Sequence, residues 1–528
     1  MTALLHDLLF DSAKRFSSNI SIKYKETSLT YAELSELVDR FSQALISIGI
    51  EKQDRVAIYL PKCLENVVAI FGSSAAGAVF VPINPVLKPH QVSHILLDCD
   101  AKILVTTQGK FRALHAALAY CVDLKYIILI DGCENQNADE HAQGLISWDD
   151  LFTDPFSLST HRVIDSDIAS LIYTSGSTGD PKGVILSHRN MVTGAKSVAQ
   201  YLGNTSSDRL LAVLPLSFDY GVSQLTTAFS VGASVVLINY LLPMEVINTL
   251  TQEKITGLAA VPPLWNLLVE LPWPSEAVEN LRYITSSGGV VPVETTELLR
   301  QVLPKTEIFL MYGLTEAFRS TYLPPDQVEK RPTSIGKAIP NVEVLVLDSD
   351  GAPCAVDEPG ELVHRGSLVA MGYWNDTNAT QERFRPIPAR LDTIPNNEIA
   401  VWSGDIVKMD REGYLYFLGR NDDLIKTSGY RVSPNEIEEI FFGTGLVSEV
   451  VAFGVPHSTL GQSIALVVIP KLGIEVTEDN LINVCKKRLA SYMMPTEIVF
   501  RTSIPSNPNG KVDRKQLALE MVESFSHQ

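Results

Sequence analysis

LIYTSGSTGDPKGVILSH, residues 171–188, runs from an apolar segment typical of a buried strand into a loop dense in glycine, serine and threonine. Glycines permit unusual backbone angles and close approach, so such a loop can present successive N–H groups and hydroxyls to phosphate oxygens. The spacing Gly176-x-x-Gly179-x-x-Lys182 lacks the contiguous Gly-Lys-Ser/Thr of a Walker A loop. The stretch therefore predicts a phosphate cradle of another kind. The alternative, a flexible surface loop, would not need Lys182, Pro181 and a preceding strand together.

The segments before this loop alternate between helix and strand patterns. Residues 30–48 repeat apolar side chains every three or four positions, and Thr30 with Glu33 forms a capping box, which predicts a helix. Four short apolar runs follow, each typical of a buried strand; they begin at Val56, Val79, Ile103 and Ile127. Buried strands that alternate with helices indicate a parallel α/β sheet, and we expect this pattern over about the first four hundred residues.

The composition changes near residue 420, where GRNDDLIK (residues 419–426) is polar and rich in turn formers. A helix over residues 433–441, a hairpin-like pair of strands near 450–453 and 464–469, and a helix before Arg488 are expected after it. We therefore predict the α/β class with two domains. The first is a large N-terminal domain of parallel α/β sheets at residues 1–419, and the second is a small α+β lid domain at residues 420–528.

Composition and charge exclude several classes of protein. The chain has 528 residues and a formal net charge of −18, with no dense run of Lys and Arg, so nucleic acid is not an expected partner. The six cysteines occur singly, without the spacing of a zinc site or a disulfide framework. The start of the chain lacks the features of a signal peptide, and residues 66–87 fit a core helix and strand better than a membrane span. We expect a cytoplasmic protein without a membrane partner.

YTSGSTGDPKGV, residues 173–184, resembles the signature loop of the adenylate-forming superfamily, which comprises acyl-CoA ligases, carrier-protein adenylation domains and luciferases. Further motifs of that superfamily occur in its order along nearly the whole chain: MYGLTEA at 311–317, GELVHRG at 360–366, SGDIV at 403–407, GRNDDLIK at 419–426 and NGKVDR at 509–514. Each motif alone is weak, but the ordered set is highly specific. The resemblance implies ATP and Mg²⁺ as the nucleotide substrate and the metal.

The resemblance also assigns roles to residues of this chain. Joining a carboxylate to the α-phosphorus of ATP brings two anions together, so the site must screen charge and hold both groups in line. Thr315 and Glu316 would hold the α-phosphate and Mg²⁺, and Lys511 would bridge the acid and the α-phosphate. The resemblance implies that Thr174, Ser175, Thr178 and Lys182 hold the β and γ phosphates, that Tyr312 stacks on adenine, that Asp405 accepts both ribose hydroxyls, and that Arg431 reaches the phosphates from the second domain. The remaining implied ATP-binding positions are Gly176, Ser177, Gly179, Gly313 and Arg420.

Each of these assignments has a simpler rival. Asp405 can cap a turn, Glu316 can cap the start of a helix, and Lys511 can be a solvated lysine near the end of the chain. His188 more often packs or hydrogen bonds, and nothing in the sequence demands imidazole chemistry there. The resemblance further implies that the small domain rotates about Asp422, so that Lys511 leaves and a thiol enters past Ser428 and Gly429.

The segment LPLSFDYG, residues 214–221, carries information about the acid. Many acyl-CoA and aryl-CoA ligases have a Phe-His pair here, and Phe218 stands at the histidine position. Asp219 aligns with the aspartate that amino-acid adenylation domains use for the substrate's α-ammonium group. A carboxylate beside an apolar pocket is costly without a cation, and an amino acid would supply one. The alternative is that Asp219 pairs with a protein cation such as Arg319, or caps the following helix.

Short stretches of the chain resemble stand-alone ligases of secondary-metabolite biosynthesis that load L-proline onto a carrier protein, which makes proline the first choice of acid. Tyr220, Ser223, Ser286 and Met311 would line the side-chain pocket, beside Phe218 and Asp219. No Gly-Gly-x-Ser carrier signature follows the small domain, so the thiol is expected from a separate carrier protein or from coenzyme A. The rivals are an acyl-CoA synthetase for a fatty or aryl acid and a non-catalytic nucleotide sensor. The role of Arg319 stays open.

Overall fold

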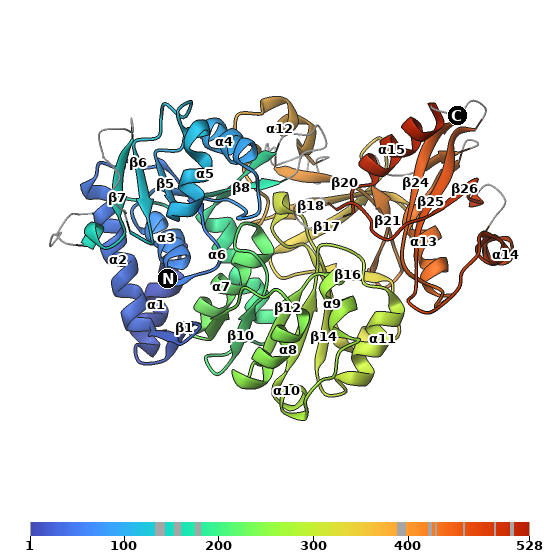
Figure 1. Cartoon of the computed structure of the whole chain (residues 1–528), viewed down its shortest axis with the longest axis horizontal. Helices are drawn as coiled ribbons and strands as arrows, with labels where there is room; N and C mark the ends of the chain where they lie inside the picture. Colours follow the sequence, from blue (N-terminus) through green and yellow to red (C-terminus); the bar gives the residue numbers. More distant parts are fainter. Residues whose placement is uncertain are drawn as a thin grey trace, which may run out of the picture.

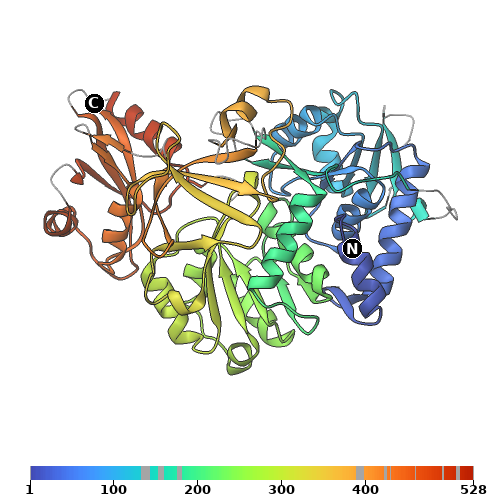
Figure 2. The same cartoon turned by 180° about the vertical axis from the view of Figure 1, so that it is seen from behind.

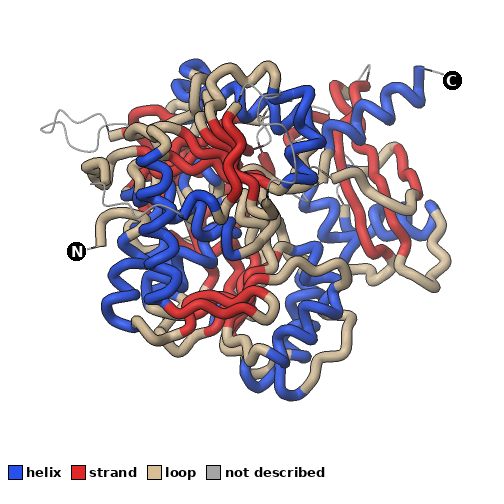
Figure 3. Tube along the Cα trace, turned by 60° about the vertical axis from the view of Figure 1, so that its left-hand side comes forward, coloured by secondary structure: helices blue, strands red, loops and turns tan. Residues whose placement is uncertain are grey.

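Three β-sheets organise the described part of the chain. A computed structural model describes residues 2–132, 143–152, 160–174, 181–387, 398–420, 425–427, 430–457, 460–489, 493–506 and 512–526. Figure 1 shows the strands of the first half in blue and green and the C-terminal strands in red, and Figure 2 shows the same arrangement from behind. The three groups of strands stand apart in the trace of Figure 3. Among the described residues, no helix is long and apolar enough to cross a membrane.

The first sheet follows the order β7-β6-β5-β3-β4-β8-β9. Its neighbours pair in parallel except β8 and β9, which are antiparallel. Its strands are β3 (Arg55–Tyr59), β4 (Val79–Pro82), β5 (Ile103–Thr106), β6 (Tyr126–Leu129), β7 (Gly144–Ser147), β8 (Ile168–Thr174) and β9 (Lys182–Ser187). The four strands predicted from Val56, Val79, Ile103 and Ile127 are β3 to β6, so this expectation is confirmed.

The helices of this part of the chain are α1 (Asp7–Phe16), α2 (Tyr31–Ser47), α3 (Leu64–Ala75), α4 (Pro89–Asp98) and α5 (Gln108–Leu118). Helix α3 packs on β3 and β4, and α2 packs on α3. The predicted capping box is present at the start of α2: Glu33 N donates to Thr30 Oγ1 at 3.2 Å, and Thr30 N donates to Glu33 Oε2 at 2.7 Å. The uncharged stretch at residues 66–87 forms most of α3, then β4, and its residues 66–83 are buried core as expected.

The second sheet contains 14 described strands. Its parallel half consists of β1 (Ile20–Tyr24), β10 (Arg209–Ala212), β11 (Ser234–Leu237), β12 (Gly257–Ala260), β13 (Tyr283–Ser286) and β14 (Glu307–Tyr312), with β2 (Thr27–Thr30) antiparallel at the edge. The helices of this half are α6 (His188–Tyr201), α7 (Asp219–Val231), α8 (Pro243–Gln252), α9 (Pro262–Leu268), α10 (Ser275–Asn280) and α11 (Val293–Val302).

Beyond β14 the second sheet becomes antiparallel, so the α/β alternation expected over the first four hundred residues ends near residue 312. Hairpin connections replace crossover helices there, because short turns can join only antiparallel neighbours. The elements are β15 (Thr321–Leu323), β16 (Ser334–Ala338), β17 (Val342–Leu347), β18 (Gly360–Gly366), α12 (Thr377–Arg383), β19 (Phe384–Pro386), β20 (Ile399–Met409) and β21 (Leu415–Arg420). The α/β fold class itself holds, with a large N-terminal part and a small C-terminal part.

The C-terminal part has its own sheet and its own core, and it stands at one end of the molecule in Figure 1. The predicted helices and hairpin are present there. Its elements are β22 (Ile425–Thr427), β23 (Tyr430–Val432), α13 (Pro434–Phe442), β24 (Val447–His457), β25 (Gly461–Pro470), α14 (Glu478–Arg488), β26 (Glu497–Phe500) and α15 (Arg514–Ser526). The domain boundary that we propose, between residues 419 and 420, falls at the end of β21.

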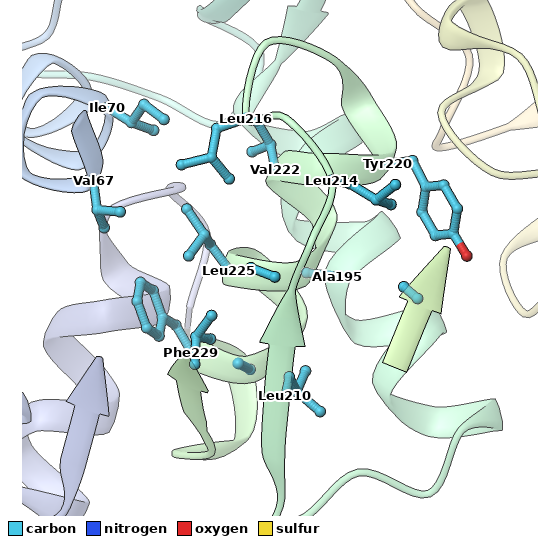
Figure 4. Close-up of a cluster of buried hydrophobic side chains, with 14 of the residues drawn as sticks. Val67, Ile70, Ala195, Leu210, Leu214, Leu216, Tyr220, Val222, Leu225 and Phe229 are labelled. Carbon is cyan, nitrogen blue, oxygen red and sulfur yellow. The ribbon is translucent and has the colours of Figure 1, made fainter. Parts of the chain in front are cut away.

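Helix α7 connects the core to the site described below. Figure 4 shows its apolar side chains Leu225 and Phe229 on the side toward Val67 of α3, and Tyr220 on the other side. Each fully buried Leu or Phe contributes about 1.5 to 3 kcal/mol to folding. Gly221 is required in the first turn, because a Cβ there would lie 1.7 Å from the carbonyl oxygen of Pro215. This close contact fixes where α7 begins.

Candidate active site

The phosphate loop predicted from the sequence joins two paired strands. β8 ends at Thr174 and β9 begins at Lys182, and these two residues are direct partners in the antiparallel register. Ser175, Gly176, Ser177, Thr178 and Gly179 lie outside the described residues, so their predicted phosphate contacts stay predictions. Lys182 forms an ion pair with Asp376, with 3.0 Å between Nζ and Oδ2. Its Nζ also lies 5.6 Å from the centre of the Tyr373 ring.

Thr315 and Glu316 lie on a single 3₁₀ turn, Thr315–Ala317, directly after β14. The Tyr373 hydroxyl donates to Glu316 Oε1 at 2.6 Å, and Ala370 N donates to the Glu316 carbonyl oxygen at 2.8 Å. The pKa of the Tyr373 hydroxyl is raised well above its usual range, mainly by burial and secondly by the negative charge of Glu316. The segment at residues 370–376 therefore contacts both Lys182 and Glu316, which come from different sheets.

The side chains of Tyr312 and Asp405 meet at the junction of β14 and β20. The Tyr312 hydroxyl donates to Asp405 Oδ2, and Arg420 Nε lies 3.3 Å from Asp405 Oδ1. Burial and the neighbouring Asp405 raise the pKa of Tyr312. The ring of His364 stacks on Tyr312 with 6.1 Å between centroids and an angle of 16°. Gly313 is packed closely, since a Cβ there would lie 3.3 Å from Cα of Arg319.

Asp219 is the first residue of α7, and it lies between the adenylation motif and a buried arginine. Arg319 Nη1 is 3.4 Å from Asp219 Oδ2, and Thr315 Oγ1 is 3.4 Å from Asp219 Oδ1. The alternative partner Arg319 therefore lies within ion-pair distance of Asp219, so the protein itself supplies a cation, and the contact with a substrate ammonium group stays a prediction. The sequence offered this pairing only as an alternative, because positions 100 residues apart do not show by themselves which side chains meet.

A small cavity of about 10 Å³ lies next to this ion pair. Three of the residues predicted to line the acid pocket border it, namely Tyr220, Ser223 and Met311, together with Arg319. The Tyr220 hydroxyl is hydrogen bonded to Thr285 Oγ1 at 2.7 Å. Ser286 and Phe218 are not among the residues that border the cavity: Ser286 ends β13 and Phe218 caps the start of α7.

Several predicted site residues lie outside the described part of the chain. These are Lys511, Asp422, Ser428 and Gly429, in addition to the phosphate loop. The backbone of Arg431 belongs to β23, but its side chain is not described. His188 is 1% exposed and accepts a hydrogen bond from Leu5 N at 3.1 Å, which is the packing role expected of it.

The sequence did not draw attention to Tyr373, Asp376 or His364. Tyr373 and Asp376 belong to GYWNDT, residues 372–377, and the available signal was an aromatic and acidic run soon after the GELVHRG motif. His364 belongs to that motif and is fully buried. Burial alone lowers its pKa to about 3, so it is neutral at physiological pH.

Two family descriptions match the chain, AMP-binding enzyme over residues 9–374 and AMP-binding enzyme C-terminal domain over residues 436–511. The first match covers more than half of the 528 residues. The chain belongs to the AMP-binding enzyme family. The chain spans only 6% and 10% of the length of two synthase polypeptides that it matches.

Both peptide synthases and acyl-CoA ligases are among the similar AMP-binding enzymes. A linear gramicidin synthase polypeptide of Brevibacillus parabrevis is 30% identical over 517 residues, which is 97% of this chain and only 6% of that much longer polypeptide. The long-chain-fatty-acid–CoA ligase FadD13 of Mycobacterium tuberculosis is 30% identical over 501 residues, 92% of both chains. The anthranilate CoA ligase AuaEII, solved with anthranoyl-AMP, has a TM-score of 0.88 at 25% identity, over 99% of this chain and 98% of that one.

Proposed function

We propose that this AMP-binding enzyme activates an amino acid as its aminoacyl-adenylate and transfers it to the phosphopantetheine thiol of a separate carrier protein. The observation that carries the proposal is the position of Asp219, 8% exposed, with its carboxylate close to Thr315 of the adenylation motif and to the cavity residue Arg319. In an α-amino acid the ammonium nitrogen is two bonds from the carboxyl carbon, so an ammonium group held by Asp219 would keep the reacting carboxylate close to Thr315. L-Proline is the first acid to test because of the sequence resemblance.

The residues present fit ATP and Mg²⁺. Glu316 offers one carboxylate, and Mg²⁺ is usually held by one or two carboxylates together with phosphate oxygens and water. Lys182 offers a cation at the end of the loop that would bind the phosphates. Asp405 can accept two ribose hydroxyl hydrogen bonds, and the partly buried ring of Tyr312 offers an aromatic face beside it. Among the described residues, no cluster of three or more His, Cys, Asp or Glu side chains forms a separate metal site.

Two steps make up the proposed reaction. In the first, an oxygen of the substrate carboxylate bonds to the α-phosphorus of ATP, and pyrophosphate leaves with the electron pair of the broken P–O bond. In the second, a thiolate bonds to the acyl carbon and AMP leaves. Lys511 would stabilise the negative charge that develops in the first step, and Lys182 would balance the charge of the phosphates.

The second candidate is an acyl-CoA synthetase for a fatty or aryl acid. The ion pair between Asp219 and Arg319 favours it, because the carboxylate already has a cation and does not need one from the substrate. The similarity to FadD13 and to AuaEII points the same way.

Exchange of labelled pyrophosphate into ATP distinguishes the candidates. The acids are the twenty amino acids with L-proline first, together with benzoate, anthranilate and octanoate. Exchange driven by an amino acid supports the proposal, and exchange driven only by aryl or fatty acids overturns it. A loading assay then compares coenzyme A with a phosphopantetheinylated carrier protein as the thiol.

A variant of Asp219 sharpens this test. Asp219→Asn keeps the size of the side chain and removes its charge, so amino-acid-dependent exchange should fall about 100-fold while ATP affinity stays within about twofold. Asp348→Asn, a surface turn residue, is the control for an acid-to-amide change elsewhere. Full activity of Asp219→Asn on an amino acid would contradict the ammonium role.

A further inference from the structure

Arg319 is a buried cation with unused hydrogen-bonding groups. The residue is 2% exposed, and within the described residues its Nε and Nη2 have no hydrogen-bond partner, whereas Nη1 faces Asp219 Oδ2 and the Phe318 carbonyl oxygen. A guanidinium group left in this state in the interior costs free energy, because each N–H has lost its water. Nε and Nη2 form one edge of the guanidinium fork, and that edge matches the two oxygens of a carboxylate.

The cavity next to Arg319 offers a further donor. Thr227 borders the same cavity, and within the described part of the chain its hydroxyl also has no partner. Tyr220 closes another side, with the Arg319 guanidinium 4.3 Å above the centre of its ring. The cavity therefore places donors from Arg319 and Thr227 around a space of about one water molecule.

The backbone holds Arg319 in this place at a cost. Phe318, directly before it, has φ of 55°, a left-handed conformation that bulky residues rarely adopt. The ring of Phe318 packs so closely on α6 that a Cβ at Gly194 would lie 2.3 Å from its Cδ1. Strain of this kind persists where the surrounding structure imposes it, and here it directs the arginine into the pocket.

We infer that the acid activated by this enzyme carries a second hydrogen-bond acceptor, a carboxylate first of all, which binds the Nε–Nη2 edge of Arg319. The inference rests on the proposed function in one respect, since Asp219 is given to the α-ammonium group. In a short amino dicarboxylate, the ammonium group would pair with Asp219 and the second carboxylate would pair with Arg319, so each charge of the ion pair would meet an opposite charge of the substrate. L-Proline has no such acceptor, so the inference places acids of the aspartate type ahead of it.

Four acids with the same four-carbon skeleton test the role of Asp219 and the role of Arg319 separately. L-Aspartate has the ammonium group and the second carboxylate, L-2-aminobutyrate has the ammonium group alone, succinate has the second carboxylate alone, and butyrate has neither. In pyrophosphate exchange by the full chain, kcat/KM for L-aspartate should exceed that for L-2-aminobutyrate roughly 10-fold to 100-fold, the usual effect of a charged hydrogen bond. The same excess should separate succinate from butyrate.

Arg319→Met removes the donors and keeps the length of the side chain. It should reduce the preference for L-aspartate over L-2-aminobutyrate to within about twofold, whereas a merely structural arginine would lower kcat/KM for both acids alike. Because this variant leaves Asp219 without Arg319, the double variant Asp219→Asn/Arg319→Met, which removes both charges, is measured beside it. The double variant should prefer neither acids with the ammonium group nor acids with the second carboxylate.

The outcomes distinguish a failure of the inference about Arg319 from a failure of the ammonium role proposed for Asp219. If L-aspartate and L-2-aminobutyrate are activated equally, or if none of the four acids drives exchange, the inference about Arg319 is overturned. If succinate matches L-aspartate and both exceed the monocarboxylates, the acceptor site stands and the ammonium role of Asp219 is wrong.

Discussion

The Tyr373 hydroxyl donates a hydrogen bond to Glu316 Oε1 at 2.6 Å, across 57 residues of sequence. Tyr373 precedes α12, and Glu316 lies on the turn after β14. The ring of Tyr373 also contacts Lys182, whose Nζ is paired with Asp376 of the same segment. One short segment therefore orients both the carboxylate proposed for Mg²⁺ and the lysine proposed for the phosphates.

The first prediction concerns this hydrogen bond. Tyr373→Phe keeps the ring and removes the donor, so Glu316 loses a hydrogen bond to a charged group that is usually worth about 1.5 to 3 kcal/mol. We expect kcat for adenylation to fall roughly 10-fold and the Mg²⁺ concentration for half-maximal rate to change, measured by pyrophosphate exchange across a Mg²⁺ titration. Tyr416→Phe, which removes another tyrosine hydroxyl from a carboxylate, Asp410, is the matched control. A Tyr373→Phe enzyme with the Mg²⁺ profile of the control would refute the positioning role.

The second prediction concerns the ribose position. Asp405→Asn removes the charge from an acceptor that is 8% exposed and contacts Tyr312 and Arg420. ATP affinity, measured by calorimetry, should weaken roughly 10-fold to 100-fold, because hydrogen bonds to a charged group are lost. Asp376→Asn changes a carboxylate that faces Lys182 instead, and its effect on affinity should be smaller. Equal affinities of wild type and Asp405→Asn would exclude the ribose role.

The third prediction concerns Lys511, which lies outside the described residues. If it bridges the acid and the α-phosphate, Lys511→Ala should reduce acyl-adenylate formation by about 100-fold or more, since a charge that stabilises the transition state is lost. Transfer from synthetic acyl-adenylate to the thiol should continue, which separates the two steps. Lys515→Ala is the neighbouring control. Unchanged adenylation in Lys511→Ala would remove that lysine from the mechanism.

The fourth prediction concerns acid stability. Burial lowers the pKa of His364 to about 3, whereas an unfolded chain has a histidine pKa of about 6.5. Between these values the unfolded state binds a proton that the native state does not, so the free energy of unfolding falls as the pH falls from about 6.5 toward 3. His364→Phe, which retains a ring against Tyr312, should show a smaller drop in Tm between pH 7.5 and pH 5 than wild type.

His188, whose pKa is also lowered to about 3 by burial and then by His6, stays in both proteins and contributes equally to them. The comparison therefore isolates His364. An identical drop in Tm for wild type and His364→Phe would show that the His364 ring does not titrate as its burial requires.

Local sequence predicted much of the fold. The helix at α2 followed from its apolar repeat and capping box, and the strands β3 to β6 followed from short buried runs, because these signals lie within the segments themselves. The change from parallel to antiparallel strands after β14 was missed. Apolar runs show that a strand is buried but not in which direction its neighbour runs.

The sequence by itself determined the family, since the glycine-rich loop and the ordered motifs after it are contiguous runs of residues that can be read without the tertiary structure. The tertiary structure alone decided the partners: Asp219 with Arg319, 100 residues later, and Tyr373 with Glu316. Such pairs form because helix α7, the turn after β14 and the segment before α12 pack against one another. The packing of these segments decides which side chains pair with one another, and no single segment of the sequence contains that information.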